Sequence, residues 1–322
     1  YVYKPKKGFG IPIQEWLSGP LKEWAEDLLL SQKIKNQNYF EATKIKEIWE
    51  DHLNNKIDTQ NDSWAQLGQD LLGGNGDQSG KSVSLSADGT IVAIGADEND
   101  GTGSNAGHVR VYQWNGTDTW TQLGEDIDGE VAGDYSGMNV SLSNDGLTLA
   151  IGAAGNYDNE HVRVYQYSSG SWTQLGQDID GEQGNSGWGN SVSLSSDGTI
   201  VAVGASDNDG NGSNAGHVRV YQYSSGSWSQ LGSDIDGEAE SDQSGISVSL
   251  SDDGSVVAIG AHLNDGNGDG SGHVRIYQYD NDNWEQIGDD IDGEAGDDNS
   301  GYSVSLSSDG SIVAIGARYN LS

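Results

Sequence analysis

The feature that most constrains the fold of this chain is a five-residue phrase that occurs five times. Tryptophan opens a W-x-Q-[LI]-G phrase at spacings of 56, 52, 56 and 56 residues, at Trp64, Trp120, Trp172, Trp228 and Trp284. Self-similarity at a fixed period of this length is typical of repeat architectures, in which each repeat is one supersecondary unit. From about Trp64 onward the sequence therefore predicts a tandem array.

Each repeat contains four segments with the pattern of β-strands. An S-V-S-L-S phrase, an apolar run such as 91–96 and an H-V-R-[VI]-Y-Q phrase precede the next tryptophan phrase. β-Branched and aromatic residues alternate with polar ones in these segments, and turns such as 87–89 and 196–198 separate them. No apolar spacing of 3.6 residues persists, and glycine is too frequent for helical repeats. The array is predicted to be all-β, with longer loops rather than a fifth strand explaining the long period.

A four-stranded unit repeated along a chain predicts the blade of a β-propeller, and a stacked β-solenoid is the alternative. We expect an incomplete β-propeller of four complete blades, at about 80–126, 137–178, 189–234 and 245–290, plus two strands of a partial fifth at 299–317. Propellers close rings of about four to eight blades, so the intact ring is expected to hold more blades. In the other interpretation, the strand near Trp64 pairs with the two strands of the partial fifth blade and closes the ring.

The composition changes at about residue 60. Residues 1–60 hold nine lysines and nine acidic residues, so the net charge of −35 lies entirely in the array. A surface this acidic repels phosphate backbones and anionic lipid, which disfavours nucleic-acid and membrane-surface partners. No run approaches the about 20 apolar residues of a membrane span, and the absence of cysteine excludes disulfides and thiolate metal sites.

A D-x-D-G-E phrase follows each complete repeat and places three carboxylates at alternate positions beside a glycine. Oxygen ligands so arranged are able to hold Ca²⁺. A single loop at 264–272, with Asp265 and Asp269, resembles a calcium-binding nonapeptide, but it occurs once and lacks the apolar residue of that motif. The alternative is a solvated acidic turn, and no metal is expected. The candidates, should calcium bind, are Asp126, Asp128, Glu130, Asp178, Asp180, Glu182, Asp234, Asp236, Glu238, Asp290, Asp292 and Glu294.

A His-x-Arg pair recurs in every complete repeat, at His108, His161, His217 and His273. We expect these histidines to serve the architecture, because equivalent positions of different blades lie too far apart to converge on one metal. The tryptophans are expected to pack between blades rather than against a ligand. No nucleophile, base and orienting group occur together as a single set, which favours a non-catalytic array.

The phrase S-G-x-S-V-S-L-S-x-D-G-[ST]-[IV]-V-A-[IV]-G-A, followed by G-H-V-R-V-Y, resembles the FG-GAP repeats of integrin α-chain propellers. This resemblance implies a binding or adhesion module, outside the cell or at its surface, whose loops contact a protein or glycan ligand. The family's Phe-Gly is Ser-Gly here, and no proline follows Gly-Ala. The family's calcium loop is reduced to a Ser-Asp-Gly turn, so calcium is not expected at that position.

The first sixty residues have a helical pattern, with amphipathic stretches at 15–30 and 41–53. The string K-P-K-K-G-F-G-I-P-I-Q-E-W-L-S-G-P-L-K-E-W-A-E-D-L-L, then I-W-E-D-H-L, resembles the carboxy-terminal end of glutamine-hydrolysing asparagine synthetases. The resemblance covers residues 1–62 and implies asparagine biosynthesis in the cytoplasm, with ATP and Mg²⁺ bound only by a complete synthetase. It assigns a phosphate contact to Lys6, with Lys7 as the second choice.

No catalytic site is intact in this segment, because the S-G-G-x-D-S loop and the amino-terminal cysteine of the family are missing from the chain. The string W-A-Q-L at 64–67 satisfies both the synthetase phrase and the repeat phrase, so we hypothesise a chimaera of two unrelated genes, or a fragment. Two functions follow from these resemblances. The chain is either a non-catalytic binding module joined to an inactive synthetase remnant, or part of an asparagine synthetase with an appended array.

Overall fold

The computed structural model of the chain describes residues 65–155, 160–182 and 186–320. The helices expected at 15–30 and 41–53, the strand at Trp64, and Lys6 and Lys7 lie outside the described residues. From Gly68 onward the described residues belong to one compact unit. Among them, no helix combines the length and apolar character that crossing a membrane requires.

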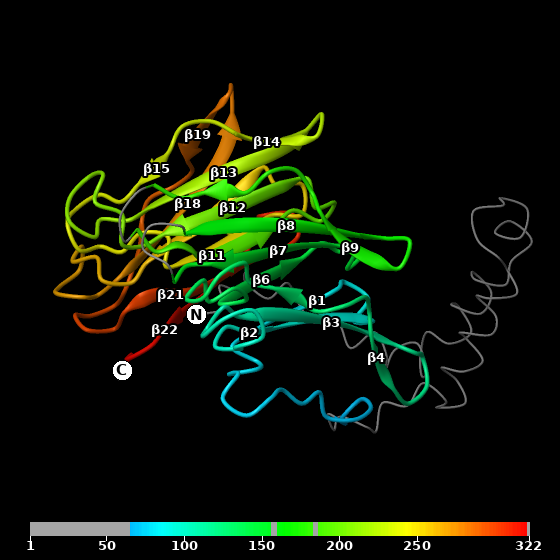
Figure 1. Cartoon of the computed structure of the whole chain (residues 1–322). Helices are drawn as coiled ribbons and strands as arrows, with labels where there is room; N and C mark the ends of the chain where they lie inside the picture. Colours follow the sequence, from blue (N-terminus) through cyan, green and yellow to red (C-terminus); the bar gives the residue numbers. More distant parts are fainter. Residues whose placement is uncertain (1–64, 156–159, 183–185, 321–322) are drawn as a thin grey trace, which may run out of the picture. The chain divides into compact units, whose positions relative to one another are not determined.

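Four antiparallel sheets and a final pair of strands follow one another along the chain, each formed by the phrases that predicted it (Figure 1). The first sheet contains β1 (Ser82–Leu85), β2 (Ile91–Ala96), β3 (His108–Trp114), β4 (Trp120–Gln122) and β5 (Ile127–Asp128). The second contains β6 (Asn139–Leu142), β7 (Thr148–Ala153), β8 (His161–Ser168), β9 (Ser171–Gln174) and β10 (Ile179–Asp180).

The remaining strands repeat the same order. The third sheet contains β11 (Trp188–Leu194), β12 (Ile200–Ala205), β13 (His217–Ser224), β14 (Ser227–Gln230) and β15 (Ile235–Asp236). The fourth contains β16 (Ser247–Leu250), β17 (Val256–Ala261), β18 (His273–Asp280), β19 (Asn283–Gln286) and β20 (Ile291–Asp292). The pair consists of β21 (Ser300–Leu306) and β22 (Val313–Ala317).

The prediction of four strands per unit is incomplete, because each full sheet has a fifth strand of two residues. In the first sheet β4 pairs with the end of β3, whereas β5 pairs with its start through His108↔Asp128 and Val109↔Ile127. β4 and β5 are thus two parts of one outer edge, interrupted near Gly124, which has a φ of 80°. The second aspartate of the D-x-D-G-E phrase therefore lies in a strand, and not in a loop.

Successive sheets pack face to face. β1 contacts β6, β6 contacts β11, β11 contacts β16 and β16 contacts β21, so the first strands of all sheets lie side by side. This arrangement is propeller-like, and it explains why the middle strands are apolar on both faces. All six residues of β7, for example, are buried.

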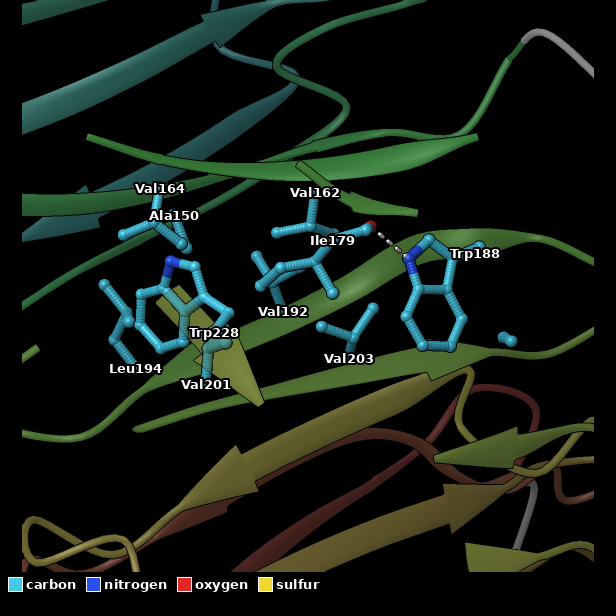
Figure 2. Close-up of a cluster of buried hydrophobic side chains, with 11 residues drawn as sticks. Ala150, Val162, Val164, Ile179, Trp188, Val192, Leu194, Val201, Val203 and Trp228 are labelled. Atoms are coloured by element: carbon cyan, nitrogen blue, oxygen red, sulfur yellow. Dashed lines mark hydrogen bonds between the residues drawn. The ribbon is translucent and has the colours of Figure 1, made fainter. Parts of the chain in front are cut away.

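The cluster between the second and third sheets illustrates the core (Figure 2). Val162 of β8 packs with Val192 of β11 and Val203 of β12, and Trp188 and Trp228 are buried in the same cluster. As predicted, the repeated tryptophans join neighbouring sheets. Their Nε1 atoms donate to the leucine carbonyl of the preceding tryptophan phrase, at 2.7 Å in Trp172 to Leu123, Trp228 to Leu175 and Trp284 to Leu231.

The serines of the S-V-S-L-S phrase also join the sheets. The amide of Leu142 donates to Ser84 Oγ of the preceding sheet at 2.9 Å, and the same bond recurs in Leu194 to Ser141, Leu250 to Ser193 and Leu306 to Ser249. One serine earlier, Ser82 Oγ donates to the Gly137 carbonyl of the following sheet at 2.8 Å, as Ser191 does to Gly245 and Ser247 to Gly301. The serines thus face the following sheet, and the valine and leucine between them face the preceding one.

Candidate ligand-binding site on the loop face

Two kinds of connection meet at one end of the sheets, which we call the loop face. One joins the second strand to the third, at 97–107, 154–160, 206–216 and 262–272, and the other joins each sheet to the next, at 129–138, 181–187, 237–246 and 293–299. Residues 156–159 and 183–185 of these connections lie outside the described part of the chain. Short parallel bridges hold them together, such as Gly107↔Ser136, Gly216↔Ser244 and Gly272↔Ser300. Among the described strands, the connections on the loop face are longer than the turns at the other end.

The loop face also carries positions at which the repeats all differ. The residue after the Gly-Ala that ends each second strand is different in all five copies: Asp97, Ala154, Ser206, His262 and Arg318. The residue just before each S-V-S-L phrase, or its equivalent, differs as well: Lys81, Met138, Asn190, Ile246 and Tyr302. Because a residue shared by every repeat serves the architecture, a site that occurs once must be built from positions that vary.

The variable side chains contact one another. Lys81 Nζ lies 3.9 Å from Asp97 Oδ2, and burial raises the pKa of the Asp97 carboxyl while Lys81 opposes that rise. The Tyr302 ring meets the His262 ring edge-on, with 5.3 Å between their centroids, and Arg318 lies over the Tyr302 ring at 4.8 Å. Variable side chains therefore contact one another at both ends of the array.

A cavity of about 310 Å³ opens on this face between the second and third sheets. Its lining combines aromatic, thioether, amide and carboxylate groups with small residues: Tyr135, Met138, Ala154, Gly155, Gly187, Asn190 and Asp207. The connection at 154–160 has seven residues where the equivalent 97–107 has eleven. The cavity therefore lies beside the one shortened loop.

The polar groups of the cavity are held by hydrogen bonds, two of them from neighbouring sheets. Asn105 Nδ2 donates to the Tyr135 hydroxyl at 3.0 Å, and Gln243 Nε2 donates to Asp207 Oδ1 at 3.0 Å. Asn190 Nδ2 donates to Ser206 Oγ at 3.1 Å. These bonds orient the lining before any ligand arrives, which reduces the entropy lost on binding.

Beneath the lining, Glu160 and Trp188 replace the glycine and serine that the other full sheets have at these places. Buried Glu160 accepts hydrogen bonds from the Ser186 hydroxyl at 2.6 Å and from the amides of Ser186, Gly187 and Trp188 at 3.1 to 3.2 Å. Trp188 is fully buried and donates from Nε1 to the Ile179 carbonyl at 2.9 Å (Figure 2). This pair fixes the lining residue Gly187.

The structure brings the D-x-D-G-E carboxylates to the repeated arginines, a pairing that the sequence analysis missed. Arg110 binds Asp126 of its own sheet through Nε and Nη2, at 3.0 and 2.9 Å to Oδ2. Arg219 binds Asp234 in the same way, at 2.9 and 2.7 Å. These hydrogen bonds lower the pKa of both carboxyl groups.

The glutamate of the phrase reaches the arginine of the following sheet. Glu130 lies 3.5 Å from Arg163, Glu238 lies 3.5 Å from Arg275, and Glu182 accepts a hydrogen bond from Arg219. The bond from Arg219 lowers the pKa of Glu182. These glutamates therefore connect neighbouring sheets, while their side chains stay 45 to 48% exposed to solvent.

The other candidate carboxylates have equivalent places. Asp178 and Asp290 accept from Gln174 and Gln286 at 2.6 Å, and Glu294 holds the glutamate position of the fourth sheet. The middle aspartates pair in register with the histidines, as Asp128↔His108, Asp180↔His161, Asp236↔His217 and Asp292↔His273. Asp265 Oδ1 accepts from the Gly270 amide at 2.8 Å, a loop bond that recurs in Asp100 to Asn105 and Asp209 to Asn214.

Three groups in the described residues have donor atoms within 4.8 Å of one another: His108 with Asp126 and Asp128, His217 with Asp234 and Asp236, and His273 with Glu238 and Asp290. The histidines stay in their separate sheets, but each meets carboxylates, which the sequence analysis did not foresee. Burial lowers the pKa of His108, His217 and His273, which favours their neutral form. In every group a carboxylate already pairs with an arginine, so a metal ion would have to compete with a guanidinium.

A larger cavity, of about 470 Å³, lies at the outer edge between the first and second sheets, where Asp126, Asp128, Tyr165 and Trp172 are part of its lining. These residue types recur at the same places in later repeats. Because these lining residues recur in later repeats, we assign this cavity to the repeated scaffold. The loop-face cavity is therefore the better candidate for a unique site.

Comparison with known proteins separates the two parts of the chain. Residues 1–72 match the asparagine synthase family, which is 72 of the 322 residues and includes the W-A-Q-L string at 64–67. No curated protein matches the chain significantly.

Among solved structures, the periplasmic gluconolactonase of Pseudomonas aeruginosa is similar in fold, with a TM-score of 0.52 and 17% identity over 73% of this chain and 64% of that one. A 6-phosphogluconolactonase candidate from Bacteroides uniformis matches with a TM-score of 0.48 and 12% identity, over 73% of this chain and 57% of that one. Hydrazine synthase of Kuenenia stuttgartiensis matches with a TM-score of 0.48 and 14% identity, over 72% and 67%. The chain thus spans about 57 to 67% of these proteins. At such identities the likeness concerns the fold alone.

Proposed function

We propose that the array is a non-catalytic, FG-GAP-like binding module whose loop face contacts a protein or glycan ligand. The observation that carries this proposal is a set of positions on one face that differ in every copy, together with a cavity of about 310 Å³ there. Elsewhere the repeated side chains bond to one another across sheets. Repeat proteins create specific sites in this way: the scaffold residues are the same in every repeat, and the residues on one face differ between repeats.

The chemistry of the cavity limits the ligand. Tyr135 and Met138 offer apolar surface, and Asn190 and Asp207 offer hydrogen-bonding groups, a combination that suits an amphipathic group such as a sugar ring or a short side chain. The net charge of −35 repels anions. We therefore expect a neutral or cationic group to enter the cavity.

The test measures binding of the chain to an array of neutral and amino-sugar glycans, and to an array of neutral and lysine-containing peptides. Wild type should bind a defined subset, and Tyr135→Ala and Asn190→Ala should each weaken that binding at least tenfold. Gln113→Ala, an exposed change on β3, is the matched control and should bind as wild type does. Equal binding by all variants would place the ligand elsewhere.

The second candidate function rests on the family match over residues 1–72. In this alternative the chain is part of an ATP-dependent asparagine synthetase, with Lys6 or Lys7 at a phosphate of the aspartyl-AMP site. We propose that this segment contributes a phosphate contact only within a complete synthetase, since ATP binding in that family also needs the pyrophosphatase loop, which residues 1–72 do not contain. Exchange of labelled pyrophosphate into ATP with aspartate present is the direct assay, and any turnover abolished by Lys6→Ala would favour the synthetase.

A further inference from the structure

The outer-edge cavity between the first and second sheets lies at a position that differs between repeats. The residue after the glycine of the W-x-Q-[LI]-G phrase is, in the five copies, Gln69, Glu125, Gln177, Ser233 and Asp289. Gln177 Nε2 donates to the Trp228 carbonyl at 2.9 Å, and Gln177 Oε1 accepts from the Trp228 amide at 3.2 Å. Gln69 forms the same two bonds with Trp120, at 2.8 and 3.1 Å, and we call this pair of bonds the glutamine clamp.

Glu125 cannot form the glutamine clamp. A carboxylate has no N–H group to donate to the Trp172 carbonyl, and among the described residues the Glu125 side chain has no hydrogen-bond partner. Between the third and fourth sheets, where glutamine is also replaced, the Ser233 amide donates instead to Asn283 Oδ1 at 3.3 Å. The interface between the first and second sheets has neither of these closures, and the cavity of about 470 Å³ lies there.

The exposure of the repeated tryptophans follows the same difference. Trp172 is partly exposed, whereas Trp228 and Trp284 are only 4% and 6% exposed. Trp172 Nε1 donates to the Leu123 carbonyl at 2.7 Å, which fixes the orientation of the indole ring. Trp172 and Tyr165 therefore give the cavity an aromatic wall on the side of the second sheet.

The wall on the side of the first sheet is acidic. Glu125 and Asp128 line the cavity and are exposed. Asp126 lies between them in the chain, but Arg110 Nη2 already donates to its carboxylate at 2.9 Å. In the described part of the chain, no hydrogen bond to the carboxylate of Glu125 or of Asp128 is formed. Two carboxylates are therefore available to a positively charged ligand beside an aromatic surface.

We propose that this cavity is a second binding site, which receives the ammonium group of a lysine side chain from a basic partner protein. An ammonium group is a compact charge with three donors and meets two separate carboxylates, whereas a guanidinium suits one planar, bidentate partner. Aromatic carbon covers the four-carbon stem of lysine and attracts its charge. The exposed rim admits a side chain that projects from another surface, and the net charge of −35 attracts basic proteins. This cavity shares no lining residue with the loop-face cavity, so the two sites are independent.

Nuclear magnetic resonance of the full chain, labelled with nitrogen-15 at its tryptophans, tests this site during titration with a blocked peptide that has one lysine among glycines. The Trp172 indole signal, identified by its loss in Trp172→Phe, should shift and saturate in about 0.15 M NaCl, where distant charges are screened. The same peptide with norleucine instead of lysine should leave the signal unchanged. Glu125→Gln supplies the residue that forms the glutamine clamp elsewhere and should weaken binding at least about tenfold. Glu285→Gln, the same change at an exposed position of β19, is the matched control and should bind as wild type does.

The next interface offers a gain of function. Gln177→Glu removes the glutamine clamp from Trp228 and should make the Trp228 indole signal respond to the lysine peptide, and an unchanged signal would contradict the role of the clamp. An unshifted Trp172 signal at about 10 mM peptide, an equal response to the norleucine peptide, or full binding by Glu125→Gln would overturn the proposal. Tighter binding of free diaminopentane than of the peptide would also overturn it, because the ligand would then be a small amine.

Discussion

Single residues in this chain have roles that depend on their repeat position, and the serines show this most clearly. In the S-V-S-L-S phrase the first serine donates to the following sheet, the second accepts from it and the third closes the turn, as in Ser86 Oγ to Asp88 at 2.8 Å. Hydrogen bonds from the Thr90 amide and the Ser86 hydroxyl lower the pKa of Asp88. The same bonds in the last turn lower the pKa of Asp309 to about 2.

Replacing the second serine should destabilise the array only where another sheet follows. Ser193→Ala leaves the Leu250 amide, which donates to it at 3.0 Å, without an acceptor, and should lower the free energy of unfolding by about 1 to 2 kcal/mol. Ser305→Ala makes the same change in the exposed last copy and should alter it by less than about 0.5 kcal/mol. Urea denaturation at low protein concentration measures both. Equal effects would show that the serines act within their own strand.

The buried histidines should make stability depend on pH. Burial, with Arg219 nearby, lowers the pKa of His217 below its ordinary value of 6.5 in the folded chain. The unfolded chain then binds more protons below about pH 6.5, so the contribution of this histidine is complete above that pH and is lost as the pH falls toward the folded pKa. The decrease in unfolding free energy from pH 7.5 to pH 5.5 should therefore be larger in wild type than in His217→Gln. The net charge also changes with pH, but it does so in both proteins, and identical slopes would contradict this account.

At the scale of strands and loops, the periodic elements were predictable and the exceptions were not. Strands such as β2 and β3 follow from alternation and recurrence in the sequence. β5 is only two residues long, Ile127 and Asp128, and no local pattern marks a strand that short. The link from Glu130 to Arg163 joins different sheets, so it depends on packing. The variable loop-face positions were visible in the sequence, but only when the five copies are compared position by position.

We expect Glu160 and Trp188 to stabilise the structure around the shortened connection at 154–160 as a pair, and substitutions of both residues test this. Glu160→Gly removes the acceptor of four hydrogen bonds, and Trp188→Ser removes a fully buried side chain, which should cost about 3 to 5 kcal/mol. The double variant has the glycine and serine that form the bridge Gly107↔Ser136 in the first unit. Its loss of stability should therefore be at least about 1 kcal/mol smaller than the sum of the single losses. Additivity in denaturant melts would show that the two residues act independently.

For the whole molecule, we expect that sheet-to-sheet cohesion does not require a metal, because arginines already bind carboxylates of the acidic groups. A single arginine, Arg219, binds both Asp234 of its own sheet and Glu182 of the sheet before it. Removing divalent ions with a chelator should then leave the thermal midpoint within about 1 °C of its value in millimolar Ca²⁺. A midpoint several degrees higher with Ca²⁺ would show that the acidic groups hold a structural ion. Arg219→Gln, which frees both carboxylates, is the variant in which such an effect should emerge first.

The central claim is that a repeating scaffold presents one unique binding face. Glycan and peptide array binding by wild type, Asn190→Ala and Gln113→Ala tests it most directly. The account predicts selective binding by wild type, a loss of at least tenfold in Asn190→Ala and no change in Gln113→Ala. Absence of selective binding by the folded wild-type chain, or equal affinity in all three proteins, would contradict it.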